Sequence, residues 1–198
     1  MLPRILAACA GVAIGAGLYA STSAWLAPVT WQTIHGRADS PGLSLSQPST
    51  PVVDSTPVRL VIPAIGVDAR VEARGLDSDR NLGTPGDFRD VAWYKLGPRP
   101  GEPGNAVLNG HVNWWTGDAV FTHLGRLRPG DQIRVVRADG LTLAFMVTSR
   151  RTVDANSRIA ALFAPSTQST MTLITCSGVW NPMTQSDTQR LLVSATLV

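Results

Sequence analysis

DQIRVVRADGLTLAFMVTSRRTVD, residues 131–154, is the stretch of sequence that decides the fold. Within it, Ile133 and Val135 stand on either side of Arg134, and this alternation is typical of a strand with one buried face. A tight-turn signature, Ala-Asp-Gly at residues 138–140, separates this run from a second apolar run. The stretch therefore predicts a β-hairpin.

Similar short runs, rich in Val, Ile, Leu and Thr, recur from Val58 to the end of the chain. They read RLVIP (59–63), DARVEARGL (68–76), NAVLNGHV (105–112), MTLITC (171–176) and RLLVSATLV (190–198). Helical patterns are confined to short candidates at residues 119–124 and 157–163. This arrangement predicts an all-β domain, a closed or nearly closed β-barrel of about eight strands with short helices, and a β-sandwich is the alternative.

The N-terminal part of the chain has a different character. The run from Ile5 to Leu26 is uncharged, and as a helix it would span roughly 33 Å, enough to cross a bilayer. We therefore expect residues 1–27 to be a single-pass anchor in the cell membrane. A cleavable signal segment, processed near residues 21–24, is the alternative. Arg4 and the terminal amine favour a cytoplasmic N-terminus and an extracytoplasmic remainder.

Residues 28–57 are rich in Pro, Ser and Thr and show no apolar periodicity. This composition predicts an extracytoplasmic linker, because such a segment buries too little apolar surface to fold. The folded domain is then residues 58–198. The formal net charge of +3, from 17 basic and 14 acidic residues without a basic run, gives no support to nucleic acid binding.

Motifs that would indicate other chemistry are missing from the sequence. It contains no HExxH, no paired CxxC, no P-loop and no GxSxG, so neither a metal ion nor another cofactor is expected. Its two cysteines are Cys9, in the apolar N-terminal run, and Cys176. Cys176 is therefore either a buried core residue or a nucleophile. It ends an apolar run and precedes Ser177 and Gly178, where the backbone leaves room for a substrate.

Three histidines compete for the role of proton-transfer partner. His111 follows a predicted strand and is preceded by a glycine, which leaves room beside the imidazole. His123 stands among apolar neighbours in a short helical segment, so we expect it to pack or to face solvent. His35 lies in the linker, without a scaffold to hold it.

Arg190 opens the last predicted strand, after a 13-residue connection from Ser177 to Gln189 that is longer than a structural hairpin needs. Antiparallel pairing of the flanking strands would return Arg190 to the neighbourhood of Cys176. A solvated surface arginine is the alternative interpretation.

The string TLITC at residues 172–176 resembles the TLxTC signature of sortases. The resemblance is strongest to the actinobacterial sortases of classes E and F. It covers most of residues 58–198, through RLVIPAIGV, the Thr84-Pro85 loop, AWY (92–94), PGEPGNAVLNGHV and LRPGDQIRVVRADG. A Gly-His pair precedes the cysteine by 65 positions and an arginine follows it by 14, in the family's order. Ala92 departs from an expected glycine, and the segment after Cys176 is rich in Gln and Thr.

The resemblance implies a sortase-like barrel and an extracytoplasmic cysteine transpeptidase. It implies that Cys176 is the nucleophile, His111 transfers protons and Arg190 stabilises the oxyanion. It further implies that an LPxTG-like sorting signal of a secreted surface protein is cleaved between Thr and Gly through a thioester. The acyl group then passes to an amine of the cell wall or of a pilin.

The resemblance also implies substrate-binding roles for Thr84, Pro85 and Thr175, and a mostly monomeric enzyme without a cofactor or metal. Two other classes of function remain open. A cysteine hydrolase would use the same three residues and pass the acyl group to water. A wall-binding module with a degenerate site would need none of them.

Overall fold

The described part of the chain folds into one closed β-barrel. The structure is a computed structural model, and it describes residues 53–115, 117–184 and 186–198. Its barrel strands are β1 (Pro57–Ile62), β2 (Val67–Arg74), β3 (Val91–Tyr94), β4 (Gly104–Asn109), β7 (Gln132–Arg137), β8 (Thr142–Asp154), β9 (Ser169–Asn181) and β10 (Ser186–Leu197). The prediction of an all-β barrel of about eight strands is thus confirmed, and the sandwich alternative is wrong.

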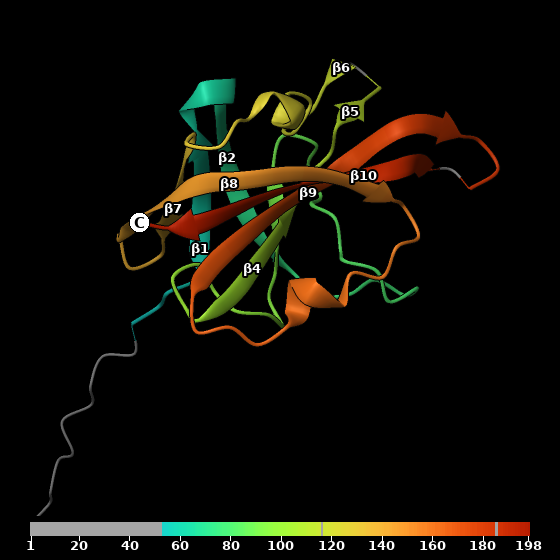
Figure 1. The fold of residues 1–198 in the computed structure, drawn as a ribbon. Helices are drawn as coiled ribbons and strands as arrows, with labels where there is room; N and C mark the ends of the chain where they lie inside the picture. Colours follow the sequence, from blue (N-terminus) through green and yellow to red (C-terminus); the bar gives the residue numbers. More distant parts are fainter. Residues whose placement is uncertain (1–52, 116, 185) are drawn as a thin grey trace, which may run out of the picture. The chain divides into compact units, whose positions relative to one another are not determined.

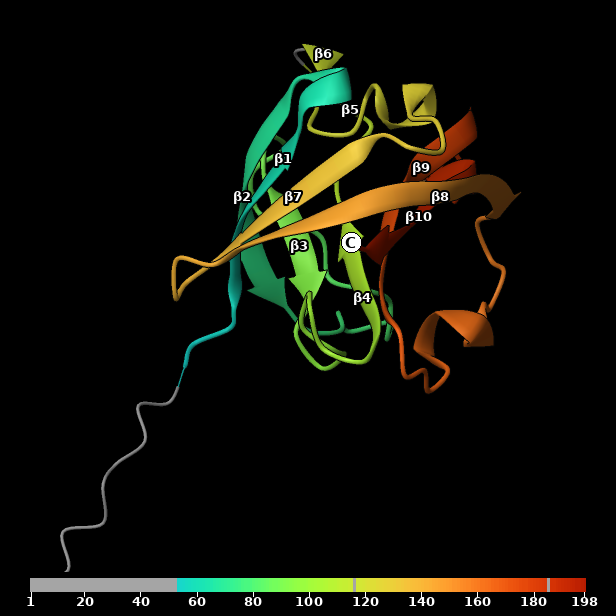
Figure 2. The ribbon, with the colours of Figure 1, turned by 60° about the vertical axis from the view of Figure 1, so that its left-hand side comes forward.

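The strands follow one another around the barrel in the order β1-β2-β3-β4-β9-β10-β8-β7, and β7 closes the ring on β1 (Figures 1 and 2). Most neighbours are antiparallel, but β2 pairs with β3 and β4 pairs with β9 in parallel. The second parallel pair matters for function. It places the ends of two strands that are distant in sequence at the same end of the barrel.

The predicted hairpin forms β7 and β8. Its register places Ile133 opposite Phe145 and Val135 opposite Leu143. Ile133, Val135 and Phe145 are fully buried, because alternate residues of each strand face the barrel interior. Burying a side chain of this size contributes roughly 2–3 kcal/mol relative to leaving it in water. The alternation in the sequence therefore correctly identifies the residues of this hairpin that face the barrel interior.

A second, smaller apolar cluster lies on the outside of the barrel wall. It consists of Val107 of β4, Leu192 of β10 and Leu162, which lies between β8 and β9. The partly buried Leu82 and Ile174 pack against it. Leu162 belongs to a 3₁₀ turn, η3 (Ala160–Phe163), in the connection between β8 and β9. The connection is therefore fixed over the outer face of β4, β9 and β10.

The helical segments of the described residues are 3₁₀ turns, shorter than the sequence suggested. The candidate at residues 119–124 is an irregular turn that leads into a 3₁₀ segment, η2 (Leu124–Arg126). The candidate at 157–163 forms only η3. A third 3₁₀ turn, η1 (Pro63–Ile65), joins β1 and β2. Apolar side chains in these segments pack into the barrel clusters, so tertiary contacts rather than a helical face account for their pattern.

The predicted connection from Ser177 to Gln189 is also different. β9 continues to Asn181 and β10 begins at Ser186, so most of this segment is a projecting β-hairpin rather than a loop (Figure 1). Gly178 adopts a left-handed φ of 91°, and a Cβ there would lie 2.5 Å from the hydroxyl oxygen of Thr188. A glycine is needed at this position because the partner strand closes over it, not because it leaves an opening for substrate.

The predicted anchor at 1–27 and most of the predicted linker at 28–57 lie outside the described residues. Near the linker's end, the backbone N–H of Ala138 donates to the carbonyl of Thr56, and that of Asp139 donates to the carbonyl of Asp54. The chain is therefore held against the β7–β8 turn a few residues before the expected boundary. Within residues 53–198, apart from the two gaps, no helix has the length and apolar character required to cross a membrane.

Candidate active site

Cys176 and Arg190 are cross-strand partners. Cys176 lies on β9, Arg190 lies on β10, and the antiparallel register pairs their Cα positions directly. Directly opposed residues of antiparallel strands have side chains on the same face, about 5 Å apart at their Cβ atoms. Both residues are half-buried on the outer face of the barrel, where Ile174 and Leu192 continue the same two rows. Pairing of the flanking strands thus brings Arg190 beside Cys176, as the sequence suggested.

His111 lies at the same end of the barrel as Cys176. It follows β4, which ends at Asn109, and Asn109 pairs in parallel with Ile174 of β9. The backbone N–H of Gly110 donates to the carbonyl of Ile174 over 3.1 Å. The hydroxyl of Thr175 donates to the carbonyl of Gly110 over 2.8 Å. Two hydrogen bonds therefore tie the His111 segment to the two residues that precede Cys176.

The surroundings of His111 are aromatic. Its ring lies 5.3 Å from the ring of Trp114, centroid to centroid, and Trp114 in turn stacks on Phe88 at 5.6 Å. Trp114 belongs to a small hairpin formed by β5 (Asn113–Trp114) and β6 (Gly117–Asp118). The histidine is thus supported on one side by a packed aromatic pair, which limits the orientations available to the imidazole.

Close packing explains why residue 110 is a glycine, which the sequence alone did not indicate. A Cβ at this position would lie 2.6 Å from Cγ1 of Val120 and 2.8 Å from Cδ2 of Phe121. The space beside the glycine is therefore filled by the segment after β6 rather than left open for the imidazole. The backbone N–H of Phe121 also donates to the carbonyl of His111, which fixes this segment against the histidine.

The three residues expected to bind substrate occupy different environments. Thr84 is exposed and Pro85 is buried, in the connection between β2 and β3. This connection reaches the outer face of the barrel, because the carbonyl of Gly83 accepts a hydrogen bond from Nδ2 of Asn109. Thr175 is only 3% exposed, and its hydroxyl is engaged by Gly110. Its hydroxyl therefore holds the His111 segment.

The guanidinium of Arg190 is held by its own hairpin. Nη1 donates to the carbonyls of Asp187 and Gln189 over 2.9 and 2.8 Å, and Nη2 donates to the hydroxyl of Ser186 over 2.7 Å. A guanidinium has five N–H donors, so Nε–H and one N–H of Nη2 remain after these bonds. The arrangement fixes the orientation of the charge and still leaves donors for an anionic ligand.

The environment of Cys176 suppresses its ionisation. Burial raises the pKa of the thiol above its ordinary value, the positive charge of Arg190 lowers it, and the negative charge of Asp187 raises it. Burial is the largest of these effects, because the charged thiolate is poorly solvated in a partly apolar site. The thiol is therefore mostly protonated near neutral pH, and its reactivity depends on the two flanking charges.

We expect alkylation of Cys176 by iodoacetamide to respond to these charges in opposite directions. Asp187→Asn removes a negative charge and lowers the thiol pKa, so at pH 8 the reaction should be about two- to threefold faster. Arg190→Gln should slow it to a similar extent. In the wild type the rate should still rise between pH 8 and pH 9. Mass spectrometry of the Cys176 peptide measures the rate. Equal rates in all three proteins would contradict the assignment of the two charges.

His123 and several residues that the sequence analysis did not single out can now be placed. His123 precedes η2 and lies between Phe121 and Leu124 along the chain, both of which are fully buried. Trp114 and Ser186 contact His111 and Arg190, respectively. The tryptophan pair three residues after His111 was a visible signal, whereas Ser186 could be recognised only from the hairpin geometry.

The arrangement has the parts of a nucleophilic acyl-transfer site. It offers a thiol, an imidazole on a segment tied to the thiol's strand, and a fixed cation opposite the thiol. In the part of the chain that the structure describes, no group of three or more His, Cys, Asp or Glu side chains is placed to hold a metal ion.

Comparison of solved structures finds the same barrel in bacterial sortases. Sortase C-1 of Actinomyces oris is 27% identical, with a TM-score of 0.56 over 74% of this chain and 77% of that protein. Sortase C2 of the Group B Streptococcus pilus island 1 is 25% identical, with a TM-score of 0.53 over 71% and 73% of the two chains. Sortase A of Corynebacterium diphtheriae, at 22% identity and a TM-score of 0.55 over 72% and 60%, shares the fold.

These structures are sortases of the C and A types, so the shared fold does not single out class E or F. No curated relative matches the sequence. The model of the sortase domain matches residues 60–198, which is more than half of the chain and includes Cys176, His111 and Arg190. The chain therefore belongs to the sortase family of cysteine transpeptidases.

Proposed function

We propose that this protein cleaves an LPxTG-like sorting signal of a secreted surface protein between Thr and Gly and transfers the acyl group to an amine. The observation that carries the proposal is the direct pairing of Cys176 with Arg190, combined with the two hydrogen bonds that tie the His111 segment to the same strand end. A thiol, an imidazole and a cation on one surface are what acyl transfer through a thioester requires.

The thiolate of Cys176 attacks the carbonyl carbon of the Thr residue, and the carbonyl oxygen becomes an oxyanion. Arg190 stabilises that charge with the N–H donors that its hairpin leaves unused. His111 donates a proton to the leaving amine as the C–N bond breaks, which leaves a thioester on Cys176. An acceptor amine then attacks the thioester, His111 takes the proton of that amine, and the C–S bond breaks to release the Cys176 thiolate and the new amide.

The outer face of the barrel provides the surface on which the peptide lies. The partly buried Ile174 continues the row of Cys176, and Leu82 from the β2–β3 connection packs against the same cluster as Ile174. Thr84 and Pro85 follow Leu82 after one intervening residue, Gly83, which supports a role for this connection beside the peptide. We assign Thr175 to the positioning of His111, because its hydroxyl is buried and bonded to Gly110.

Several finer features belong to the same proposal. The acceptor is an amine of the cell wall or of a pilin, and the enzyme acts mostly as a monomer. The chain is held in the cell membrane by residues 1–27, with residues 58–198 outside the cell, and its sequence motifs favour class E or F. These statements follow from the family resemblance and from the uncharged N-terminal run.

Product analysis tests the proposal. The protein is incubated with fluorescent peptides that carry LPxTG or related motifs, with and without an added glycine-based or diaminopimelate-based amine. Mass spectrometry should detect the acyl group joined to the amine, after cleavage between Thr and Gly. Cleavage that yields only the free acid, even with excess amine, would identify a cysteine hydrolase instead. If none of the peptides is bound or cleaved, the proposed substrate class is contradicted.

A further inference from the structure

An exposed pair of tryptophans stands beside the imidazole of His111. Trp114 of β5 and Trp115, in the turn between β5 and β6, are 38% and 89% exposed. Their indole rings meet at 90° with 5.9 Å between the centroids, so the two rings form a corner. The Trp114 ring also lies 5.3 Å from the ring of His111. Large aromatic side chains that are open to solvent are typical of a binding surface, and this surface adjoins the residue assigned to proton transfer.

The corner is held in place from both sides of its base. Trp114 stacks on Phe88 of the β2–β3 connection, with an angle of 11° between the ring planes. The backbone N–H of Val120 donates to the carbonyl of Phe88 over 2.9 Å, and the hydroxyl of Thr122 donates to the carbonyl of Val112. The segments before and after the β5–β6 hairpin are thus tied to their neighbours. A surface that is already fixed loses little entropy when a ligand binds to it.

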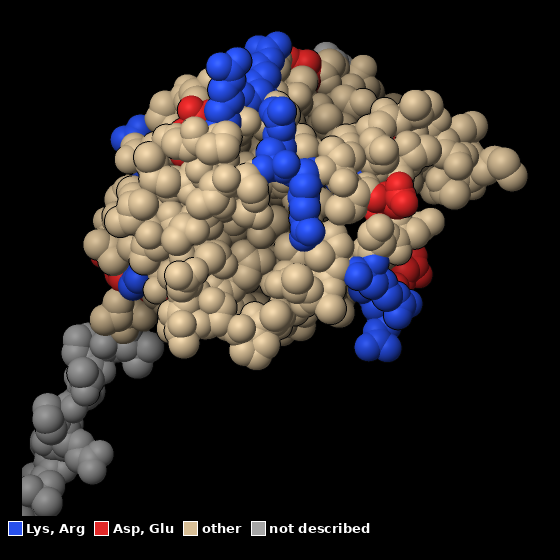
Figure 3. Space-filling view, viewed as in Figure 1, with Lys and Arg blue, Asp and Glu red and all other residues tan. Residues whose placement is uncertain are grey.

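The charge around the corner suits an amine. Residues 113–118 include Asp118 and no basic residue, and Asp118 is exposed and forms no ion pair within the described part of the chain. Arg89 lies over the ring of Phe88, but its guanidinium is paired with Asp87. Lys and Arg side chains form a column in the upper half of Figure 3, and the surface to its right, where Figure 1 places both hairpins, is mainly uncharged. An approaching ammonium group is therefore attracted by Asp118.

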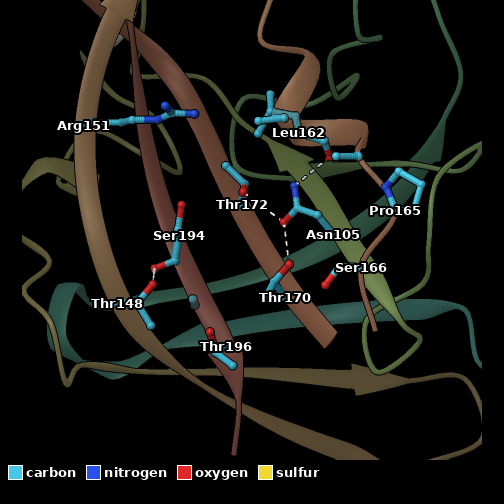
Figure 4. A pocket seen from close by; sticks show the side chains of 13 residues that line it. Asn105, Thr148, Arg151, Leu162, Pro165, Ser166, Thr170, Thr172, Ser194 and Thr196 are labelled. Atoms are coloured by element: carbon cyan, nitrogen blue, oxygen red, sulfur yellow. Dashed lines mark hydrogen bonds between the residues drawn. The ribbon is translucent and has the colours of Figure 1, made fainter. Parts of the chain in front are cut away.

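A hollow of about 270 Å³ beside Arg151 lies farther along the outer face of the barrel (Figure 4). Leu162 packs in one apolar cluster with Leu192 and Ile174. In the register of β9 with β10, this cluster lies between the hollow and Cys176. The hollow is therefore separated from the thiol, whereas the tryptophan corner directly adjoins the site.

The mechanism says which ligand must come to this corner. The acceptor amine has to lie within about 3 Å of the imidazole of His111, because the imidazole takes its proton. The leaving amine of the proposed motif belongs to a glycine, which brings no side chain to the indoles. An amine on an aliphatic stem does so, since four single bonds of about 1.5 Å each give a stem roughly 5 Å long.

This length matches the spacing of the rings. With its nitrogen at His111, such a stem covers the 5.3 Å step to Trp114 and brings its far end beside Trp115, one further step of 5.9 Å away. Its methylene groups then leave water and lie against the indole faces, as the stems of long charged side chains do on apolar surfaces.

We propose that Trp114 and Trp115 form the acceptor subsite of this enzyme. The subsite takes an amine on an aliphatic stem, as in the side chain of lysine or diaminopimelate, in preference to the α-amine of glycine. This inference deepens the proposed function and rests on it. Trp114 also orients His111, so Trp115, which meets Trp114 on its other side from the proton-transfer chemistry, is the residue on which acceptor choice can be tested.

The test measures how the acyl-enzyme divides between water and an amine. A fluorescent LPxTG peptide is incubated with each enzyme and with increasing concentrations of Nα-acetyl-lysine amide or of glycinamide. The ratio of amide product to free acid is plotted against amine concentration, and its slope gives the reactivity toward that amine relative to water. Both products come from the same acyl-enzyme, so the slope does not depend on how fast the acyl-enzyme forms.

The enzymes compared are the wild type, Trp115→Ala, Trp115→Leu and Trp180→Ala. Trp180 is the matched control, because it is another exposed tryptophan, at 58%, but lies on β9 four residues beyond Cys176. That separation is about 13 Å along the strand. Circular dichroism checks that each variant has folded.

In Trp115→Ala, the slope for the lysine amide should fall about three- to tenfold, the effect of about one buried methylene group or two partly buried ones. The slope for glycinamide should change much less, because glycinamide has no stem that reaches the indoles. Trp115→Leu should recover part of the loss, since leucine keeps apolar surface at this position. Trp180→Ala should keep both wild-type slopes.

The outcomes separate the subsite from the proposed function. If Trp115→Ala keeps the wild-type slope for the lysine amide, the subsite is wrong, while the formation of amide still supports the proposed function. Equal losses for the two amines in Trp115→Ala, or an equal loss in Trp180→Ala, would also overturn the subsite. If the wild type releases only free acid with either amine, or cleaves no peptide, the proposed function fails and the subsite fails with it.

Discussion

Replacing Cys176 with alanine is expected to lower turnover of a sorting peptide by at least about 10⁴-fold and to abolish the covalent acyl-enzyme. The reason is that the thioester has no other sulfur on which to form, since Cys176 is the free cysteine of the described part of the chain. Rates are measured by chromatography of the cleaved peptide, and the acyl-enzyme is measured by intact-protein mass spectrometry after a brief incubation.

Cys9→Ala is the matched control, because Cys9 is the only other cysteine of the sequence. In the full-length protein this variant should keep the wild-type rate. Circular dichroism of both variants checks that the barrel has folded. Appreciable turnover or a covalent adduct in folded Cys176→Ala would show that another residue is the nucleophile.

His111→Ala should lower turnover by at least about 100-fold, the lower end of what a general acid or base contributes. The loss should fall mainly on kcat, because the imidazole acts on protons during bond breaking and bond formation rather than on peptide binding. Added imidazole should recover part of the rate, because a small molecule can enter the space vacated by the side chain. Steady-state kinetics with and without imidazole measure both effects.

His123→Ala serves as the comparison for this experiment. His123 lies next to the fully buried Leu124, and its replacement should change the melting temperature more than kcat. A folded His123→Ala protein with a larger loss of kcat than His111→Ala would mean that the proton-transfer partner has been misassigned.

The β-barrel could be predicted from the sequence because apolar and polar residues alternate along any strand that has one face in the core and one in solvent. The run from Ile133 to Val135 is such a case, and its inward residues are fully buried. The candidate residues Cys176, His111 and Arg190 could be named from their order along the chain. Their proximity depends on the parallel pairing of β4 with β9 and on the register of β9 with β10.

Other features could not be predicted because they depend on contacts between distant segments. Composition suggested a loop at residues 177–189, but cross-strand hydrogen bonds extend both strands into a hairpin. Thr175 belongs to a recognisable motif, yet only the fold shows that its hydroxyl bonds to Gly110. A hollow on the outer face of the barrel is lined by side chains from β4, β8, β9, β10 and the segment around η3, so no local sequence pattern marks it.

The register between β9 and β10 couples the placement of Arg190 to that of Cys176 without involving the tip of the hairpin. A slip of one residue would turn Arg190 to the opposite face of the sheet, whereas the turn at residues 182–184 lies beyond the pair formed by Cys176 and Arg190. Exposed Val179, Trp180 and Met183 near that turn can therefore vary without moving the pair. For protein engineering, the sequence of residues 182–184 can be exchanged, provided that both strands keep their pairing from Asn181 and Ser186 inward, because Ser186 and Asp187 hold the guanidinium of Arg190.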